Sequence, residues 1–165
     1  MNNEALTTYL NDHLAGSEAA KALAERCAAS NAGTPLAAFL QRLVAKIEGE
    51  QAVVKDLLAR AGSEVNAVKA AVGWLGEKAS RLKLDNPLQS YSALNRLEQV
   101  EGLLLGVRGK KALWDALGAT LQTDPRFVEI GFDELSRDTK QQLTELERHR
   151  LVAAHEAFVA DVPGT

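Results

Sequence analysis

The chain has 165 residues, with 19 lysines and arginines against 22 aspartates and glutamates, so its formal net charge at pH 7 is −3. This mild acidity argues against a protein that binds nucleic acid, which would need a basic face to displace counterions from the phosphates. The single cysteine excludes an internal disulfide and a zinc site built on cysteines. With 46% hydrophobic and 25% charged residues, the composition is typical of one globular domain over residues 1–165, with a disordered tail from about 160 to 165.

The amino-acid usage predicts an all-α fold. Alanine and leucine, which are strong helix formers, dominate the chain. The β-branched residues that a sheet favours are scarce, and isoleucine occurs only at Ile47 and Ile130. No stretch alternates between apolar and polar residues as a half-buried strand would.

The first two predicted helices are separated by a short turn. We expect the first helix over about 3–30 and the second over about 35–61. Thr34 is the predicted N-cap of the second helix, and Pro35 suits its first position because proline lacks the N–H that would stay unpaired there. Gly62 suits the residue just past the helix end.

Three further helices follow in the sequence. A shorter one is expected over about 66–84, stopped by Pro87, and a long one over about 90–122. Asp133 is the predicted N-cap of the last helix, which continues to about 159.

These lengths predict an antiparallel four-helix bundle with an additional short helix in the crossover. The long helices would each measure about 40 Å. The first two must form an antiparallel hairpin because their connection is too short to do more than reverse the chain.

The chain shows no sign of a membrane or secretory segment. No apolar run approaches the roughly 20 residues that span a bilayer. The N-terminus has no basic region followed by an apolar stretch, so it does not resemble a secretory signal. We therefore predict a cytoplasmic protein without membrane contact.

Every long helix carries a polar or ionisable residue on or near its apolar stripe, where an unpaired polar group would cost a few kcal/mol. The positions along the helices are compatible with one buried cluster at mid-bundle. Its predicted members are His13, Glu50, Glu101, Arg108, Glu147 and Arg150.

The order of two long helices, a crossover and two more long helices resembles the ferritin-like superfamily. That resemblance implies a dinuclear iron or manganese site, with a Glu from each of two helices and a Glu-x-x-His from each of the other two. Carried onto this chain, the metal ligands would be His13, Glu50, Glu101 and Glu147. The two pattern histidines are replaced by Val53 and Arg150.

The arginines indicate what could stand in place of a metal. An inward guanidinium can neutralise carboxylates through paired hydrogen bonds. Arg108 and Arg150 therefore favour a structural charge network at a degenerate metal site. No cofactor is favoured on this interpretation, with iron or manganese as the alternative.

Several other residues have simpler interpretations. His13 alone in an apolar stripe is more often a core histidine with one partner than a ligand. His149 and His155 are six residues apart and do not share a helix face, so both are expected at the surface. Cys27 is expected to be a small buried residue.

The glycines at 102, 106 and 109 are unusual in a helix, because each costs about 1 kcal/mol relative to alanine. They favour a close helix crossing. The segment 73–76 is a natural partner, and the small residues could receive the indole of Trp74 or Trp114.

Taken without a structure, the chain is expected to be a non-catalytic ferritin-like bundle protein that acts through protein association, as a homodimer. One alternative is a dinuclear iron or manganese oxidoreductase or iron-handling protein with an atypical site. The other alternative is a carrier for a small apolar ligand held between the helices.

Overall fold

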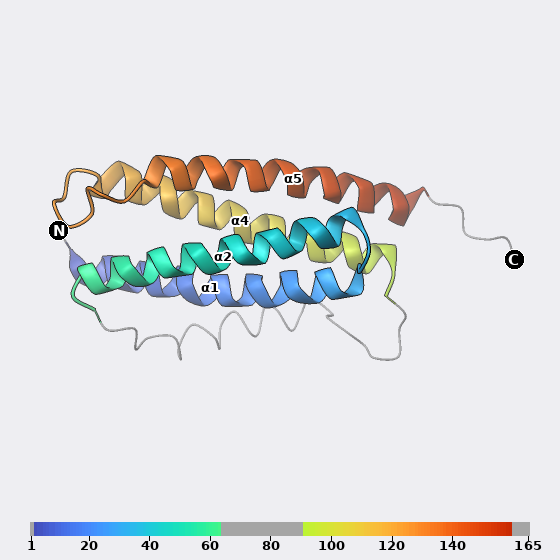
Figure 1. Ribbon diagram of the computed structural model, residues 1–165, viewed down its shortest axis with the longest axis horizontal. Helices are drawn as coiled ribbons and strands as arrows, with labels where there is room; N and C mark the ends of the chain where they lie inside the picture. The colour runs from blue at the N-terminus through green and yellow to red at the C-terminus, as the bar shows by residue number, and fades with distance from the viewer. Residues whose placement is uncertain (1, 64–90, 160–165) are drawn as a thin grey trace, which may run out of the picture.

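A computed structural model describes residues 2–63 and 91–159 of the chain. Over these two ranges it contains four long α-helices and no strand, so the all-α prediction is confirmed (Figure 1). The predicted helix over 66–84, with the segment 73–76, and the predicted tail over 160–165 lie outside the described residues. Within the described residues, no helix is long and apolar enough to cross a membrane.

The first two helices begin and end where the sequence predicts. Helix α1 covers Asn3–Ser30 and helix α2 covers Pro35–Arg60. The Thr34 hydroxyl accepts a hydrogen bond from the Ala37 N–H at 3.2 Å, which satisfies one of the free donors of the first turn of α2. Gly62 follows α2 with a φ of +79°, a left-handed conformation that glycine adopts without strain.

Helix α4, Ala93–Leu121, starts with a reciprocal cap in which Ser92 and Asn95 each bond the other's backbone N–H. Helix α5 covers Phe132–Phe158, and the prediction of Asp133 as its N-cap is wrong. The N-cap is Gly131, which makes no side-chain cap bond. The buried ring of Phe132 starts this helix earlier, and Asp133 instead lies in the first turn, where a negative charge favours the helix dipole.

Hydrogen bonds between residues at the helix ends show which ends lie together. At one end of the bundle, Arg60, the last residue of α2, donates to the backbone carbonyl of Arg126, and the Arg126 guanidinium reaches Asn3 of α1. At the other end, Asn31 after α1 donates to Tyr91 before α4. Figure 1 accordingly shows α2 ending and α4 beginning at opposite ends of the molecule.

The helices pack as two sequential pairs, α1 with α2 and α4 with α5, and α1 also packs along α4. A Cβ added at Gly106 of α4 would lie 3.7 Å from the Cβ of Ala20 of α1, which is an ordinary van der Waals distance. The predicted close crossing is therefore not found at Gly106, nor at Gly109, where nothing lies within 4 Å of an added Cβ, and the predicted partner segment 73–76 lies outside the described residues.

The core consists of two apolar clusters, one toward each end of the bundle. The cluster near the α1–α2 turn includes Leu23, Cys27, Leu40, Leu43, Val100, Leu103 and Leu146. The cluster near the α4–α5 turn includes Leu10, Leu14, Leu57, Trp114, Leu117, Phe127 and Phe132. Between them, every one of these helices contributes polar side chains at the same level, and this level forms the candidate site.

Candidate functional site

A layer of polar side chains separates the two apolar clusters, and we call it the central polar layer. Its members are Ser17 of α1, Glu50 and Gln51 of α2, Lys110 of α4 and Gln142 of α5. Each of these residues lies three or four positions from buried residues of its own helix, so it shares their inward face. Lys110, for example, is three residues after Val107 and four before Trp114, and both of these are buried.

Three of these side chains form a closed triangle. The Lys110 ammonium donates to Glu50 Oε2 at 2.5 Å and to Gln142 Oε1 at 2.6 Å. Gln142 Nε2 donates in turn to Glu50 Oε1 at 3.2 Å. Both carboxylate oxygens are therefore occupied by donors, and three helices that are distant in sequence are joined at mid-bundle.

Because Lys110 and Glu50 are buried, each depends on the other for a compensating charge. The side chains of Lys110 and Glu50 are only 14% and 9% exposed. Burial lowers the pKa of Lys110, and the charge of Glu50 and the hydrogen bond to it oppose that shift. Each charge is thus compensated mainly by its partner, and losing either would leave the other buried and unpaired.

A second polar contact ties α1 to α2 at the same level. Gln51 Nε2 donates to the Ser17 hydroxyl at 2.9 Å, and that hydroxyl donates to the backbone carbonyl of Leu14 at 2.6 Å. The layer therefore reaches all four helices.

A pocket of about 390 Å³ adjoins this layer and is lined by residues of α1, α2 and α4. Its surface is mostly apolar, and Gly16, Gly106 and Gly109 leave backbone bare along its walls. Glu50 and Lys110 form part of the lining, as does Trp114. The arrangement combines an apolar space with a small group of polar atoms, which is typical of small-molecule sites.

His13 borders this pocket instead of joining the triangle. Its ring packs edge-on against Tyr9, with 4.6 Å between ring centroids. Burial lowers its pKa, and the nearby charge of Asp12 partly opposes the shift. Among the described residues, no hydrogen bond or ion pair joins His13 to Glu50.

The other predicted cluster members lie on the outer side of α4 and α5, so the prediction of one buried cluster of all six residues is wrong. Glu101 and Arg108 are exposed. Arg150 grips Glu147 on its own helix at 2.6 and 3.0 Å and reaches Glu101 at 3.6 Å. The inward stripe of α4 passes through Val100 and Leu104, which leaves Glu101 beside it.

These placements do not fit the dinuclear metal site that the ferritin-like resemblance implies. Glu50 faces an ammonium group, whose positive charge opposes a bound cation, and both of its oxygens already accept hydrogen bonds. Glu101 and Glu147 are held by Arg150 at the outer face. Across residues 2–63 and 91–159, no three His, Cys, Asp or Glu side chains come together in a way that could hold a metal ion.

The sequence reading missed Lys110 and Gln142. The signal that identified Glu50, a helical spacing to apolar neighbours, is present at both residues. Gln142, for example, lies four residues before the buried Leu146. The glycines before Lys110 favour a close helix crossing, and that interpretation gives no reason to expect a lysine among the inward residues.

The prediction that His149 lies at the surface is also wrong. The residue is buried, and its ring stacks on Phe39 of α2 at a centroid distance of 5.2 Å. Burial lowers its pKa, as does the charge of Arg148 beside it. The spacing between His149 and His155 indicated only that they face different ways, and His155 is the exposed one.

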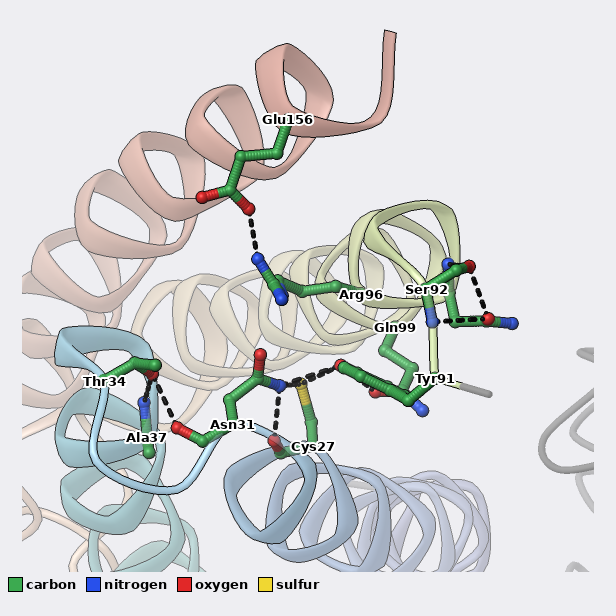
Figure 2. A network of polar contacts seen from close by, with 10 residues as sticks. Cys27, Asn31, Thr34, Ala37, Tyr91, Ser92, Arg96, Gln99 and Glu156 are labelled. Atoms are coloured by element: carbon green, nitrogen blue, oxygen red, sulfur yellow. Dashed lines mark hydrogen bonds and ion pairs between the residues drawn. The ribbon is translucent and has the colours of Figure 1, made fainter. Parts of the chain in front are cut away.

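A separate polar network fastens the start of α4 to the end of α1 (Figure 2). Asn31 Nδ2 donates to the carbonyl of Cys27 at 2.7 Å and to the Tyr91 hydroxyl at 2.8 Å. Tyr91 donates to Gln99 Oε1 at 3.0 Å, and burial raises the pKa of Tyr91 to about 12. Burial also raises the pKa of the Cys27 thiol, so this residue is the small buried cysteine that the sequence predicts.

No protein family, curated protein or solved structure shows a significant match to this chain.

Proposed function

We propose that this chain is a non-catalytic ferritin-like bundle protein that acts through association, with a lysine–carboxylate pair where its relatives in architecture would hold metal. The observation that supports this is the Lys110 ammonium bonded to Glu50 and Gln142 at the centre of the bundle. An ammonium group supplies one positive charge with three hydrogen-bond donors, and so can stabilise an inward carboxylate without an ion.

The ferritin-like, antiparallel topology belongs to the same proposal. It is supported by the meeting of Asn3, Arg60 and Arg126 at one end and of Asn31 and Tyr91 at the other. A crossover that returns along the length of the bundle is the connection that ferritin-like folds use.

The outer face of α4 and α5 supports association with a second copy. Large exposed apolar side chains on α4 are Leu94 and Leu105, and those on α5 include Leu151 and Phe158. An ion pair between Arg96 and Glu156 joins the start of α4 to the end of α5. A two-fold dimer could cover the same patch on both copies.

Sedimentation of the full chain at micromolar concentration tests the dimer. We expect a dimer for the parent chain and a monomer for Leu105→Glu, because a charge buried at the interface would remain unpaired. Val128→Glu is the matched control, since Val128 is similarly exposed but lies in the α4–α5 connection. A monomeric parent chain would contradict the proposal.

The runner-up is an iron or manganese oxidoreductase or iron-handling protein. It would require Glu50 to exchange Lys110 for a metal, and Glu101 and Glu147 to turn inward. Metal analysis after equilibration with Fe²⁺ or Mn²⁺ and desalting separates the two readings. We expect less than one ion per chain, unchanged in Glu50→Gln, whereas two ions per chain that disappear in Glu50→Gln would establish the runner-up.

A further inference from the structure

The pocket that adjoins the central polar layer has the size and surface of a ligand site. Its volume of about 390 Å³ lies within the range of about 300–1,000 Å³ that small-molecule sites occupy. Its surface is mostly apolar, with side chains such as Val54, Val107 and Leu113 in the lining. Gly109 leaves space at one wall, because nothing lies within 4 Å of a Cβ added there.

Asp12 of α1 contributes a negative charge to this lining that no other described residue compensates. Glu50 and Lys110 also line the pocket, but they neutralise each other through their ion pair. Burial lowers the pKa of His13, so that ring is mainly neutral at pH 7. Asp12 makes no hydrogen bond or ion pair within the part of the chain that the structure describes. The described lining therefore holds two carboxylates against one ammonium group.

The surroundings of Asp12 favour an organic cation. Tyr9 precedes Asp12 by three residues, so the two side chains are neighbours on α1, and both line the pocket. An aromatic ring attracts a cation through its negative face, and the carboxylate adds an opposite charge. A neighbouring hollow shares Tyr9 and Asp12 and adds Glu4, with no lysine or arginine among its described lining residues. Negative charge is therefore concentrated at this end of the pocket.

The uncompensated charge of Asp12 distinguishes between possible head groups. The Asp12 carboxylate would repel an anionic head group. A neutral molecule that covered Asp12 would take water from a carboxylate and supply no charge in return. A cation supplies the missing charge, while its hydrocarbon part can lie against the apolar walls.

We propose that this pocket binds a small amphiphilic cation, such as an alkylammonium ion, with its head group at Asp12 and Tyr9. Both of these side chains are exposed, so the head group keeps part of its contact with water. The hydrocarbon chain lies against the apolar walls from α2 and α4. This binding goes beyond the association proposed above and does not require a dimer.

Octylammonium, octan-1-ol and octanoate form a matched set of probes, because they share a chain and differ in head group. Isothermal titration calorimetry of the full chain at low ionic strength gives the three affinities. We expect saturable binding of octylammonium, about threefold to tenfold tighter than that of octan-1-ol, with octanoate the weakest. No saturable binding of octylammonium, or equal or tighter binding of octan-1-ol, would overturn the proposal.

Asp12→Asn removes the charge and keeps the shape of the side chain, and Glu18→Gln is its control. Both acids are exposed on α1, but only Asp12 lines the pocket. Octylammonium affinity should fall about threefold or more in Asp12→Asn and stay unchanged in Glu18→Gln. Octan-1-ol affinity should fall in neither variant. An equal loss of octylammonium affinity in both would indicate general charge attraction and contradict a site at Asp12.

Gly109→Leu tests the place of the hydrocarbon chain, and Gly49→Leu is its control. Both glycines are inside helices with nothing within 4 Å of an added Cβ, but only Gly109 lines the pocket. Octylammonium affinity should fall about tenfold or more in Gly109→Leu, because leucine occupies space that the chain would fill, and stay unchanged in Gly49→Leu. Equal affinity in the two variants would contradict binding in this pocket. If Gly109→Leu does not fold, the exposed Asp12→Asn still tests the proposal.

Discussion

At the scale of single residues, the most consequential feature is a charge pair that is stable only as a pair. Lys46 and Asp138 also join α2 to α5, at 2.8 Å, but these side chains are 58% and 39% exposed. Water and salt screen an exposed pair, so it contributes little, whereas the buried Glu50 depends on Lys110. Two lysine–carboxylate ion pairs therefore differ greatly in how much the loss of one partner would destabilise the protein.

Replacing each lysine by methionine makes this difference measurable. Lys110→Met should lower the free energy of unfolding by about 3–5 kcal/mol, because it strands a buried carboxylate. Lys46→Met should cost no more than about 1 kcal/mol. Urea unfolding followed by circular dichroism gives both values, and equal costs would show that Glu50 is solvated in the native protein.

Two histidines should make stability fall in mild acid. Burial lowers the pKa of both His13 and His149 below the ordinary value of 6.5, so the unfolded chain takes up protons at a higher pH than the folded chain. As pH falls through 6.5, the unfolded state binds more protons and the free energy of unfolding decreases. Below the lowered folded pKa values the decrease levels off.

Urea unfolding at several pH values between 7.5 and 5 tests this dependence. His149→Gln should flatten it, whereas His155→Gln should leave it unchanged, because His155 is exposed. A profile that His149→Gln does not alter would mean that His149 keeps its ordinary pKa in the folded protein.

At the scale of helices, the sequence predicts boundaries well because local chemistry sets them. Thr34 caps α2 through a contact three residues away, and Gly62 follows α2 through its own backbone freedom. Asp133 shows the limit of such reasoning: burial of Phe132 against the rest of the core starts α5 before the expected cap. The burial of Phe132 depends on tertiary packing, which cannot be predicted from the sequence around Asp133.

The glycines offer a test of helix and turn chemistry. Gly49→Ala should stabilise the protein by about 0.5–1 kcal/mol, because the new methyl meets nothing within 4 Å and alanine favours a helix. Gly62→Ala should instead destabilise it by about 1 kcal/mol, since its φ of +79° strains a residue with a Cβ. Thermal unfolding of both variants checks the opposite signs, and shifts of the same sign would refute the assigned backbone conformation at position 62.

The candidate site was less predictable than the helices for a geometrical reason. A helix stripe places Glu50 and Glu101 equally near an apolar face, and their neighbours in sequence do not distinguish the middle of the face from its edge. Lys110 and Gln142 are close to Glu50 only because three helices meet there. One sequence does not show which residues of separate helices meet. The prediction therefore places Glu50 correctly in the interior but does not find its partners, Lys110 and Gln142.

At the scale of the molecule, the central polar layer divides one bundle into two apolar cores. Apolar side chains of similar shape can slide past one another along a bundle with little change in energy. The triangle of Glu50, Lys110 and Gln142 is satisfied at one alignment of α2, α4 and α5, because a shift by one turn would move each partner by about 5.4 Å. We expect this layer to set the alignment of the helices more than their stability.

Replacing the whole triangle separates alignment from stability. The triple variant Glu50→Leu, Lys110→Met and Gln142→Leu removes both charges together, so no buried group is left unpaired. Its free energy of unfolding should equal or exceed that of the parent chain, in contrast to Lys110→Met alone. Its amide NMR spectrum should show doubled or broadened signals from helices in more than one alignment. A single sharp set of signals would show that the apolar cores already fix the alignment, and a large loss of stability would show that the layer contributes net free energy to folding.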